Sequence, residues 1–216
     1  MAAALVAVTP CPPALDAGFF DRSVHIVARE LIGCTLTFGG VGGIIVETES
    51  YEAADPACHA YGGRTRRNEV LFGPPGLAYV YFSYGVHNLL NAVAEPEGRA
   101  AAVLIRALEP RHGLGEMRRR RRRRAVAELC SGPGKLTEAL GIGLDVNGSS
   151  LLEAPFAMRG RGRKWNGAEI VAGPRIGINR AADLPWRFCA AGSPYLSRPA
   201  TYRPPAAPNP RRRRRR

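Results

Sequence analysis

The sequence lacks the cysteine pattern of a disulfide-stabilised or zinc-binding protein. Its five cysteines are odd in number and none forms a Cys-x-x-Cys pair, which argues against a disulfide framework and against a zinc ribbon. It also lacks any apolar run that approaches the roughly 18 residues of a membrane-spanning helix. The apolar segment 2–8 has no basic leader and is followed by Pro10, so we expect no secretory signal. These absences favour a cytosolic protein with reduced thiols and no membrane partner.

The basic charge of the chain is concentrated in two arginine runs. The 216 residues carry a formal net charge of +13, with 31 Lys and Arg against 18 Asp and Glu. Arg118–Arg124 and Arg211–Arg216 together hold the whole excess, so the rest of the chain is neutral on balance. Such runs repel themselves, remain solvated and suit polyanions such as nucleic acid. Biased coding would produce the same runs, so they are a weak indication of function.

Short β-rich segments separated by Gly and Pro turns make up most of the sequence. Strands are predicted at residues 35–38, 43–51, 77–84, 87–93, 101–108, 170–178 and 187–191. Capping signals predict helices at residues 24–32, 113–128 and 133–140. Because there is neither an internal repeat nor a β-α-β alternation, we expect a single α+β domain with a mainly antiparallel sheet. We place this domain at residues 16–198, between a flexible N-terminal arm (1–15) and a disordered Arg- and Pro-rich tail (199–216).

Two glutamates lie in an otherwise apolar predicted strand. Alternate residues of a strand share a face, so Glu47, Glu49 and Tyr51 are expected to point the same way. One interpretation is the solvent-facing edge of a half-buried sheet. The other is a carboxylate positioned to activate water or to stabilise a cation. The pattern alone leaves both interpretations open.

A tyrosine-rich segment precedes a predicted hairpin turn. Residues 78–85 contain four aromatic residues, a composition that usually builds a core. Tyr84, however, comes just before the turn glycine Gly85, where a large side chain tends to project outward. An aromatic at a hairpin tip is suited to wedge between base pairs, and Tyr51 and Tyr81 could offer flat faces to a planar ligand.

Three further groups are candidates for chemistry. Arg106 lies inside a predicted strand, where its charge requires a carboxylate or phosphate partner. Ser131–Lys135 opens a predicted helix and could present N–H groups and a lysine to phosphate, although an ordinary capped helix has the same pattern. Cys58, His59 and His87 could meet around a metal, but no paired ligand spacing supports this. We therefore expect neither a metal nor a cofactor.

In combination these segments resemble the alkyladenine (3-methylpurine) DNA glycosylase family. The match runs in order from about residue 16 to residue 198. Its blocks are Val46–Tyr51, His59, Arg64–Asn68, Phe72–Gly76, Tyr79–Gly85, Asn91, Val103–Pro110, Leu129–Leu136, Arg187-Phe188 and Gly192–Pro194. The resemblance implies a single-domain α+β fold with a curved, mainly antiparallel sheet, flanking helices and a protruding β-hairpin that inserts into DNA.

The resemblance also implies an activity and a catalytic pair. The activity is that of a monofunctional glycosylase, which flips alkylated or deaminated purines (3-methyladenine, 7-methylguanine, hypoxanthine class) out of duplex DNA. Such an enzyme hydrolyses the N-glycosidic bond and initiates base excision repair. Glu49 corresponds to the general base that activates water, and Arg106 to the arginine that helps to hold this water. Cleavage of this bond has an oxocarbenium-like transition state, which a carboxylate stabilises.

The remaining roles implied by the resemblance concern the base and the duplex. Tyr84 corresponds to the residue that fills the gap left in the duplex. No lysine occurs among the matched pocket positions, so no lyase activity is expected. The pocket residues implied by the resemblance are Tyr51, His59, Tyr81 and Asn91, the last crowding the 2-amino group of normal guanine. The candidate phosphate contacts are Arg64 and Lys135.

The chain departs from the family pattern in three places. Arg66 stands where the family has proline, Val86 stands where relatives often have methionine, and Arg118–Arg124 replaces a more mixed segment. A noncatalytic nucleic-acid-binding domain on the same scaffold is the main alternative, and an arginine-rich RNA-binding protein is a third. Retention of Glu49 and Arg106 favours the enzyme. We expect a monomer that acts on duplex DNA with damaged purines, at the nucleoid in the bacterial cytoplasm.

Overall fold

The computed structural model describes residues 11–200 of the chain. Its α-helices are α1 (Ala17–Phe20), α2 (Val24–Leu31), α3 (Leu114–Arg121) and α4 (Pro133–Leu140). Its strands are β1 (Thr35–Phe38), β2 (Val41–Glu52), β3 (Ala78–Ser83), β4 (His87–Val93), β5 (Ala101–His112), β6 (Phe156–Arg159), β7 (Ile170–Gly173) and β8 (Arg187–Ala190). Single 3₁₀ turns lie at Glu69–Phe72, Val126–Glu128, Leu144–Val146 and Arg163–Trp165.

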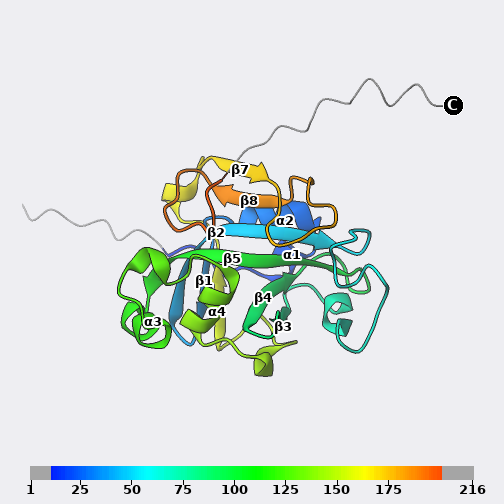
Figure 1. Cartoon of the computed structure of the whole chain (residues 1–216), viewed down its shortest axis with the longest axis horizontal. Helices are drawn as coiled ribbons and strands as arrows, with labels where there is room; N and C mark the ends of the chain where they lie inside the picture. Colours follow the sequence, from blue (N-terminus) through cyan, green and yellow to red (C-terminus); the bar gives the residue numbers. More distant parts are fainter. Residues whose placement is uncertain (1–10, 201–216) are drawn as a thin grey trace, which may run out of the picture.

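Strand β2 is the centre of the sheet. One of its edges pairs with β5, and the other pairs with β1 through residues 41–44 and with β8 through residues 47–49. The order is β3-β4-β5-β2-β1-β6, with β7 beyond β8, and each of these pairings is antiparallel. The sheet therefore divides at β2 into two branches, of which β8 and β7 lie above the long central strands in Figure 1. The expected single α+β domain with a curved, mainly antiparallel sheet is confirmed.

Two glycines allow neighbouring strands to approach β2 closely. A Cβ on Gly42 would lie 2.0 Å from the carbonyl oxygen of Leu36, and one on Gly43 would lie 2.0 Å from that of Glu109. No side chain fits at such distances, so glycine is required. Beyond these glycines, β2 and β5 pair irregularly, with register shifts on both sides of Glu47. Irregularities of this kind change the direction of side chains, and here they occur where the strand carries its glutamates.

Helix α2 covers one face of β2. The Thr48 hydroxyl on β2 donates to the carbonyl of Ala28 on α2 at 2.8 Å. Residues 45–50 of β2 are all buried, so the strand is covered on its other face as well. The interpretation of Glu47 and Glu49 as a solvent-facing sheet edge is therefore wrong. The buried residues of α2 are Val24, Val27, Ala28 and Leu31.

The arginine run Arg118–Arg124 is partly built into the fold. The predicted helix over residues 113–128 is wrong in extent, because α3 ends at Arg121 and Arg122 is left-handed, with φ of 51°. Like charges one turn apart destabilise a helix, and acidic residues pair with only some of these arginines. The ion pairs are Arg119 and Arg120 with Glu116, Arg121 with Glu138, and Arg123 with Glu128. The expectation of a fully solvated run is corrected accordingly.

The remaining differences from the predicted elements are short. The strand expected at 170–178 ends at Gly173, because Pro174 has no N–H for the ladder. Strand β6 was not predicted; it pairs with β1 at the edge of the sheet. The N-terminal segment contacts β6 in turn, because the N–H of Leu15 donates to the carbonyl of Met158 at 3.0 Å. The described part of the predicted arm is thus attached to the sheet. Among the described residues, no helix is long and apolar enough to cross a membrane.

Candidate active site

A cavity of about 600 Å³ lies between the β3–β4 hairpin, the start of α4 and the loop after β7. Most of the residues singled out from the sequence meet in its wall. Those that line it are Tyr51, His59, Tyr81, Tyr84, Asn91, Arg106 and Lys135. Arg64 is not among the lining residues, and Glu49 lies immediately behind them.

Glu49 is fully buried and is held by groups that belong to the cavity wall. Its Oε2 accepts hydrogen bonds from the Tyr51 hydroxyl at 2.8 Å and from Arg106 Nη1 at 3.1 Å. Its Oε1 accepts a hydrogen bond from the N–H of Ile176 at 2.7 Å. A single layer of hydrogen-bond donors therefore separates the carboxylate from the cavity. A water molecule entering this layer would meet a carboxylate able to take its proton.

The two glutamates of β2 have opposite electrostatic environments. Burial by itself raises the pKa of a carboxyl group. At Glu49 burial outweighs the attraction of Arg106 and the hydrogen bonds, so the pKa is raised above its ordinary value of 4.5. At Glu47 burial is outweighed by Arg106 and Arg187 together with hydrogen bonds from Ser197, and the pKa is lowered. Neighbouring carboxyls whose pKa values are driven apart are typical of acid–base centres, and the raised pKa makes Glu49 the more basic carboxylate of the two.

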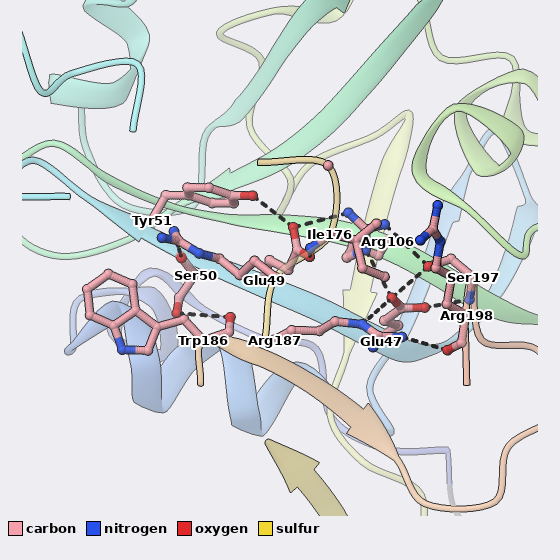
Figure 2. Close-up of polar contacts among 12 residues, drawn as sticks. Glu47, Glu49, Ser50, Tyr51, Arg106, Ile176, Trp186, Arg187, Ser197 and Arg198 are labelled. Atoms are coloured by element: carbon pink, nitrogen blue, oxygen red, sulfur yellow. Dashed lines mark hydrogen bonds and ion pairs between the residues drawn. The ribbon is translucent and has the colours of Figure 1, made fainter. Parts of the chain in front are cut away.

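Arg106 bridges the two glutamates, as Figure 2 shows. Its Nε donates to Glu47 Oε1 at 2.9 Å, its Nη1 reaches Glu49, and its side chain is only 6% exposed. The expectation that this strand arginine needs a carboxylate partner is confirmed, with two partners instead of one. Burial is compensated because each charge of the group faces an opposite one.

Neutral aromatic rings form one wall of the cavity, close to Arg67. The His59 and Tyr81 rings meet edge to face with centroids 4.5 Å apart, and the Tyr79 and Tyr81 rings stack at 5.5 Å. Burial, with a contribution from Arg67, lowers the pKa of His59, and burial raises the pKa of Tyr81 to about 12. All three rings are therefore neutral near pH 7. Such a wall suits a flat, apolar-faced ligand.

The orientation of His59 and Asn91 is fixed by one neighbour, Tyr79. His59 Nδ1 lies 2.9 Å from the Tyr79 hydroxyl, and the Asn91 amide nitrogen donates to the Tyr79 carbonyl at 3.1 Å. Asn91 is 95% buried on β4, opposite Tyr79 on β3. With its amide N–H engaged by the backbone, Asn91 presents a fixed shape to the cavity. It can therefore exclude ligands by size.

Tyr84 stands at the tip of the β3–β4 hairpin. Tyr84 and Gly85 have φ of 50° and 68°, and the N–H of Val86 donates to the Ser83 carbonyl at 3.1 Å. Two positive φ angles are characteristic of the type I′ hairpin turn, which matches strand twist. The Tyr84 side chain is 89% exposed, so the alternative that it is a core residue is wrong. Its hydroxyl donates to the carbonyl of Gly177 at 3.2 Å, across the mouth of the cavity.

The two candidate phosphate contacts occupy different positions. Lys135 lies in the first turn of α4, borders the cavity and has its Nζ 3.3 Å from the Ser131 hydroxyl. Lys135 is not one of the pocket positions implied by the resemblance, but it lies at the border of the same cavity. Arg64 is exposed on a loop, with its guanidinium 5.6 Å from the centroid of the Phe72 ring. The structure does not bring these two residues together in the cavity.

Within residues 11–200, no group of three His, Cys, Asp or Glu side chains is arranged to hold a metal ion. Cys58, His59 and His87 all border the cavity, yet His59 is engaged by Tyr79 through Nδ1. Burial raises the pKa of Cys58, which disfavours the thiolate that a metal would need.

Sequence reasoning missed the residues that hold the site from the side of β7 and β8. Arg175 pairs with buried Asp55 and lies over the ring of Tyr51, with its guanidinium 4.5 Å from the centroid. This contact anchors the loop whose next residue, Ile176, donates to Glu49. Because Ile176 acts through its main chain, its side-chain identity gives no signal. Arg187 lies in a block of the resemblance and could have been found there.

Comparison with known proteins identifies the family of the chain. The methylpurine-DNA glycosylase family profile matches residues 18–194. A relative from Rhodopseudomonas palustris is 62% identical over 187 residues, covering 87% of this chain and 89% of the relative. Relatives from Bradyrhizobium diazoefficiens and Nitrosospira multiformis are 55% and 52% identical and cover 86% and 87% of this chain, and 91% and 94% of their own lengths. All three are provisionally named 3-methyladenine DNA glycosylase. The chain therefore belongs to the methylpurine-DNA glycosylase family.

Proposed function

We propose that the protein removes alkylated and deaminated purines, of the 3-methyladenine, 7-methylguanine and hypoxanthine class, from duplex DNA. The observation that carries this proposal is the buried Glu49, paired with Arg106 behind an aromatic cavity. A carboxylate in this position deprotonates a water molecule and stabilises the positive charge that develops on the sugar. The family membership of the chain supports the same activity.

The substrate class follows from the chemistry of the leaving group. Alkylation at N3 or N7 makes a purine cationic, so the base can leave without a strong general acid. The cavity wall offers neutral rings, those of His59, Tyr79 and Tyr81, that can stack on such a base. Damaged bases also unpair at a lower cost than normal ones, which aids their extrusion.

The exposed Tyr84 is suited to occupy the space that the extruded base leaves in the duplex. It projects from the turn of the β3–β4 hairpin beside the cavity, and aromatic wedges of this kind unstack base steps. In this role its hydroxyl gives up the Gly177 carbonyl when DNA binds. Lys135 and Arg64 then remain as phosphate contacts outside the chemical step.

Because the relatives are bacterial and the proposed substrate is chromosomal DNA, we place the activity at the nucleoid, in the cytoplasm. We also propose that the chain acts as a monomer. The alternative is a noncatalytic nucleic-acid-binding domain on the same scaffold. It is disfavoured by Glu49, because a protein that only binds DNA gains nothing from burying a carboxylate beside its ligand site.

The test is release of free base from duplexes that each contain one lesion: 3-methyladenine, 7-methylguanine, hypoxanthine or ethenoadenine. A glycosylase releases the base from at least one of the first three and leaves an abasic site. Undamaged duplex of the same sequence is the matched control. Tight binding to all duplexes without any release would establish the noncatalytic alternative.

A further inference from the structure

Glu47 takes no part in the bond-cleaving step described above, yet its carboxylate is densely hydrogen-bonded. The side chain is fully buried, two residues before Glu49 on β2, and it does not line the cavity. Its Oε1 accepts from Arg106 Nε at 2.9 Å, from Arg187 Nε at 2.8 Å and from the Ser197 hydroxyl at 2.7 Å. Its Oε2 accepts from the N–H of Ser197 at 2.6 Å. Four donors from three parts of the chain thus converge on one carboxylate (Figure 2).

These contacts determine how Arg106 meets Glu49. Nε of Arg106 is bound to Glu47, Nη1 to Glu49, and Nη2 lies 3.3 Å from the Ser197 hydroxyl. All three nitrogens of the guanidinium are therefore engaged, and its plane is fixed. An arginine that faced Glu49 alone would favour a bidentate pair, with two parallel hydrogen bonds to both carboxylate oxygens. Such a pair would occupy the lone pairs that a general base needs for water.

The network is also balanced in charge. Glu47 and Glu49 are faced by Arg106 and Arg187, so two negative charges meet two positive ones. Arg187 is held in turn by the carbonyl of Arg198, to which its Nη2 donates at 2.6 Å. Buried ion networks of this kind contribute little stability compared with apolar packing of the same volume. A gain in stability therefore does not account for this one.

We propose that Glu47 is a positioning residue: together with Arg187 and Ser197 it holds Arg106 so that a single nitrogen reaches Glu49. The proposal rests on the proposed function, because it assigns Glu47 to the preparation of the same general base. The segment after β8 becomes part of the catalytic machinery through Ser197, which contacts Glu47 with both its N–H and its hydroxyl.

The proposal has a signature in the pH profile. The negative charge of Glu47 raises the pKa of Glu49, whereas Arg106 lowers it. Loss of the Glu47 charge therefore lets Glu49 remain ionised to a lower pH. The decrease of the rate at acidic pH, called here the acidic limb of the pH profile, then occurs at a lower pH. Tyr81 and Cys189 remain neutral in this range because burial raises the pKa of each to about 12. The titratable and charged groups around Glu49 are Glu47 and Tyr51 on β2, Arg106 on β5, Tyr81 on β3, and Arg187 and Cys189 on β8.

The experiment compares the full-length wild type with Glu47→Gln and Ser197→Ala, and with Glu52→Gln as the matched control. Glu52 lies on the same strand, is half-exposed and faces His25 at 3.5 Å, away from the network. The measurements are the single-turnover rate of base release at saturating enzyme from pH 4 to pH 9, binding to an abasic-site duplex, and thermal unfolding. Displacements of about 1 Å in a catalytic group can cost about 100-fold in rate.

We expect Glu47→Gln to slow the rate by about 10- to 100-fold and to move the acidic limb to lower pH, with abasic-site binding within about twofold of wild type. Ser197→Ala should slow the rate by a smaller factor without moving the limb, because Glu47 keeps its charge. Glu52→Gln should match the wild type in rate and limb. A folded Glu47→Gln with the wild-type rate and limb overturns the proposal.

Glu47→Gln leaves two arginines around a neutral group, so thermal unfolding decides whether the variant is folded. Where it is not, Ser197→Ala decides: a rate equal to that of the wild type overturns the positioning role. Failure of the proposed function is distinct, because the wild type itself would then release no base from any lesion. That outcome refutes both proposals, whereas release by wild type and Glu47→Gln alike refutes only the positioning role.

Discussion

Replacing Glu49 by glutamine tests the proposed base with the least change in shape. The carboxylate accepts hydrogen bonds from Tyr51, Arg106 and the N–H of Ile176. A carboxamide offers one oxygen and one NH₂ group, so at least one of these donors faces another donor. A buried donor without a partner lowers the free energy of unfolding by about 1–3 kcal/mol. Part of this loss is offset, because the substitution also removes a carboxylate whose burial is unfavourable. With about 2–4 °C per kcal/mol for a domain of this size, the melting temperature should fall by no more than about 10 °C.

Catalysis should suffer far more than stability. Glutamine cannot accept the proton of the attacking water, and loss of a general base typically costs about 10²–10⁴ in rate. This corresponds to about 3–5 kcal/mol of transition-state stabilisation. The assay is single-turnover release of the alkylated base with enzyme in excess, alongside binding to an abasic-site duplex. Binding should change little, because Glu49 lies behind the wall that contacts the base.

The pH dependence of the wild type supplies the second half of this test. Because the pKa of Glu49 is raised above 4.5, the rate should be constant at neutral pH and decrease as the pH falls through a midpoint above 4.5. In Glu49→Gln the residual rate should lose this limb. An unchanged single-turnover rate in a folded Glu49→Gln protein would remove Glu49 from the mechanism and make Glu47 the next candidate for the base.

Other predictions address the DNA contacts and the nucleophile. Tyr84→Ala should weaken base extrusion by about 1–3 kcal/mol, the contribution of a stacking aromatic, whereas Tyr84→Phe should retain extrusion. A fluorescent base analogue at the lesion reports extrusion directly, and equal signals from Tyr84→Ala and wild type would contradict the wedge role of Tyr84. Borohydride added during the reaction should trap no covalent DNA adduct, because water is the nucleophile in the proposed mechanism. An adduct that disappears in Lys135→Ala would reveal lyase chemistry. Deletion of Arg211–Arg216, which lies outside the described residues, should weaken binding to damaged and undamaged duplex by similar factors and lower the salt slope by up to about 0.9 per lost phosphate contact, and a slower saturated chemical step with unchanged binding would refute this.

Local patterns in the sequence were sufficient for much of the fold. Strands β1 and β4 and helix α4 have the predicted bounds, because turn residues stand close to their ends, namely Gly39 after β1, Gly85 before β4 and Gly141 after α4. The helix through Arg118–Arg124 was predicted too long, because the run of identical residues gives no sign that Arg122 takes a left-handed conformation and ends α3. Strand β6 was missed, because it is held by pairing with β1 rather than by a pattern of its own.

The site was predictable to the extent that it consists of side chains within recognisable motifs. A carboxylate partner of Arg106 could be predicted, because burying an arginine inside a strand is costly unless its charge is paired. The contribution of Ile176 could not be predicted, because a main-chain N–H carries no side-chain signature and its position depends on Arg175 and Asp55 far apart in sequence. The network around Glu47 required the structure for the same reason, since Ser197 lies 150 residues away along the chain.

That separation of 150 residues has a consequence during protein synthesis. A ribosome must deliver β2 first and then almost the whole remaining domain before β8 and Ser197 can pair with it. A chain that ends before β8 contains Arg106 but lacks Arg187 and Ser197, which are the other residues that bind Glu47. With the positioning role proposed for Glu47, the full rate of base release is reached only when translation of the whole domain is complete.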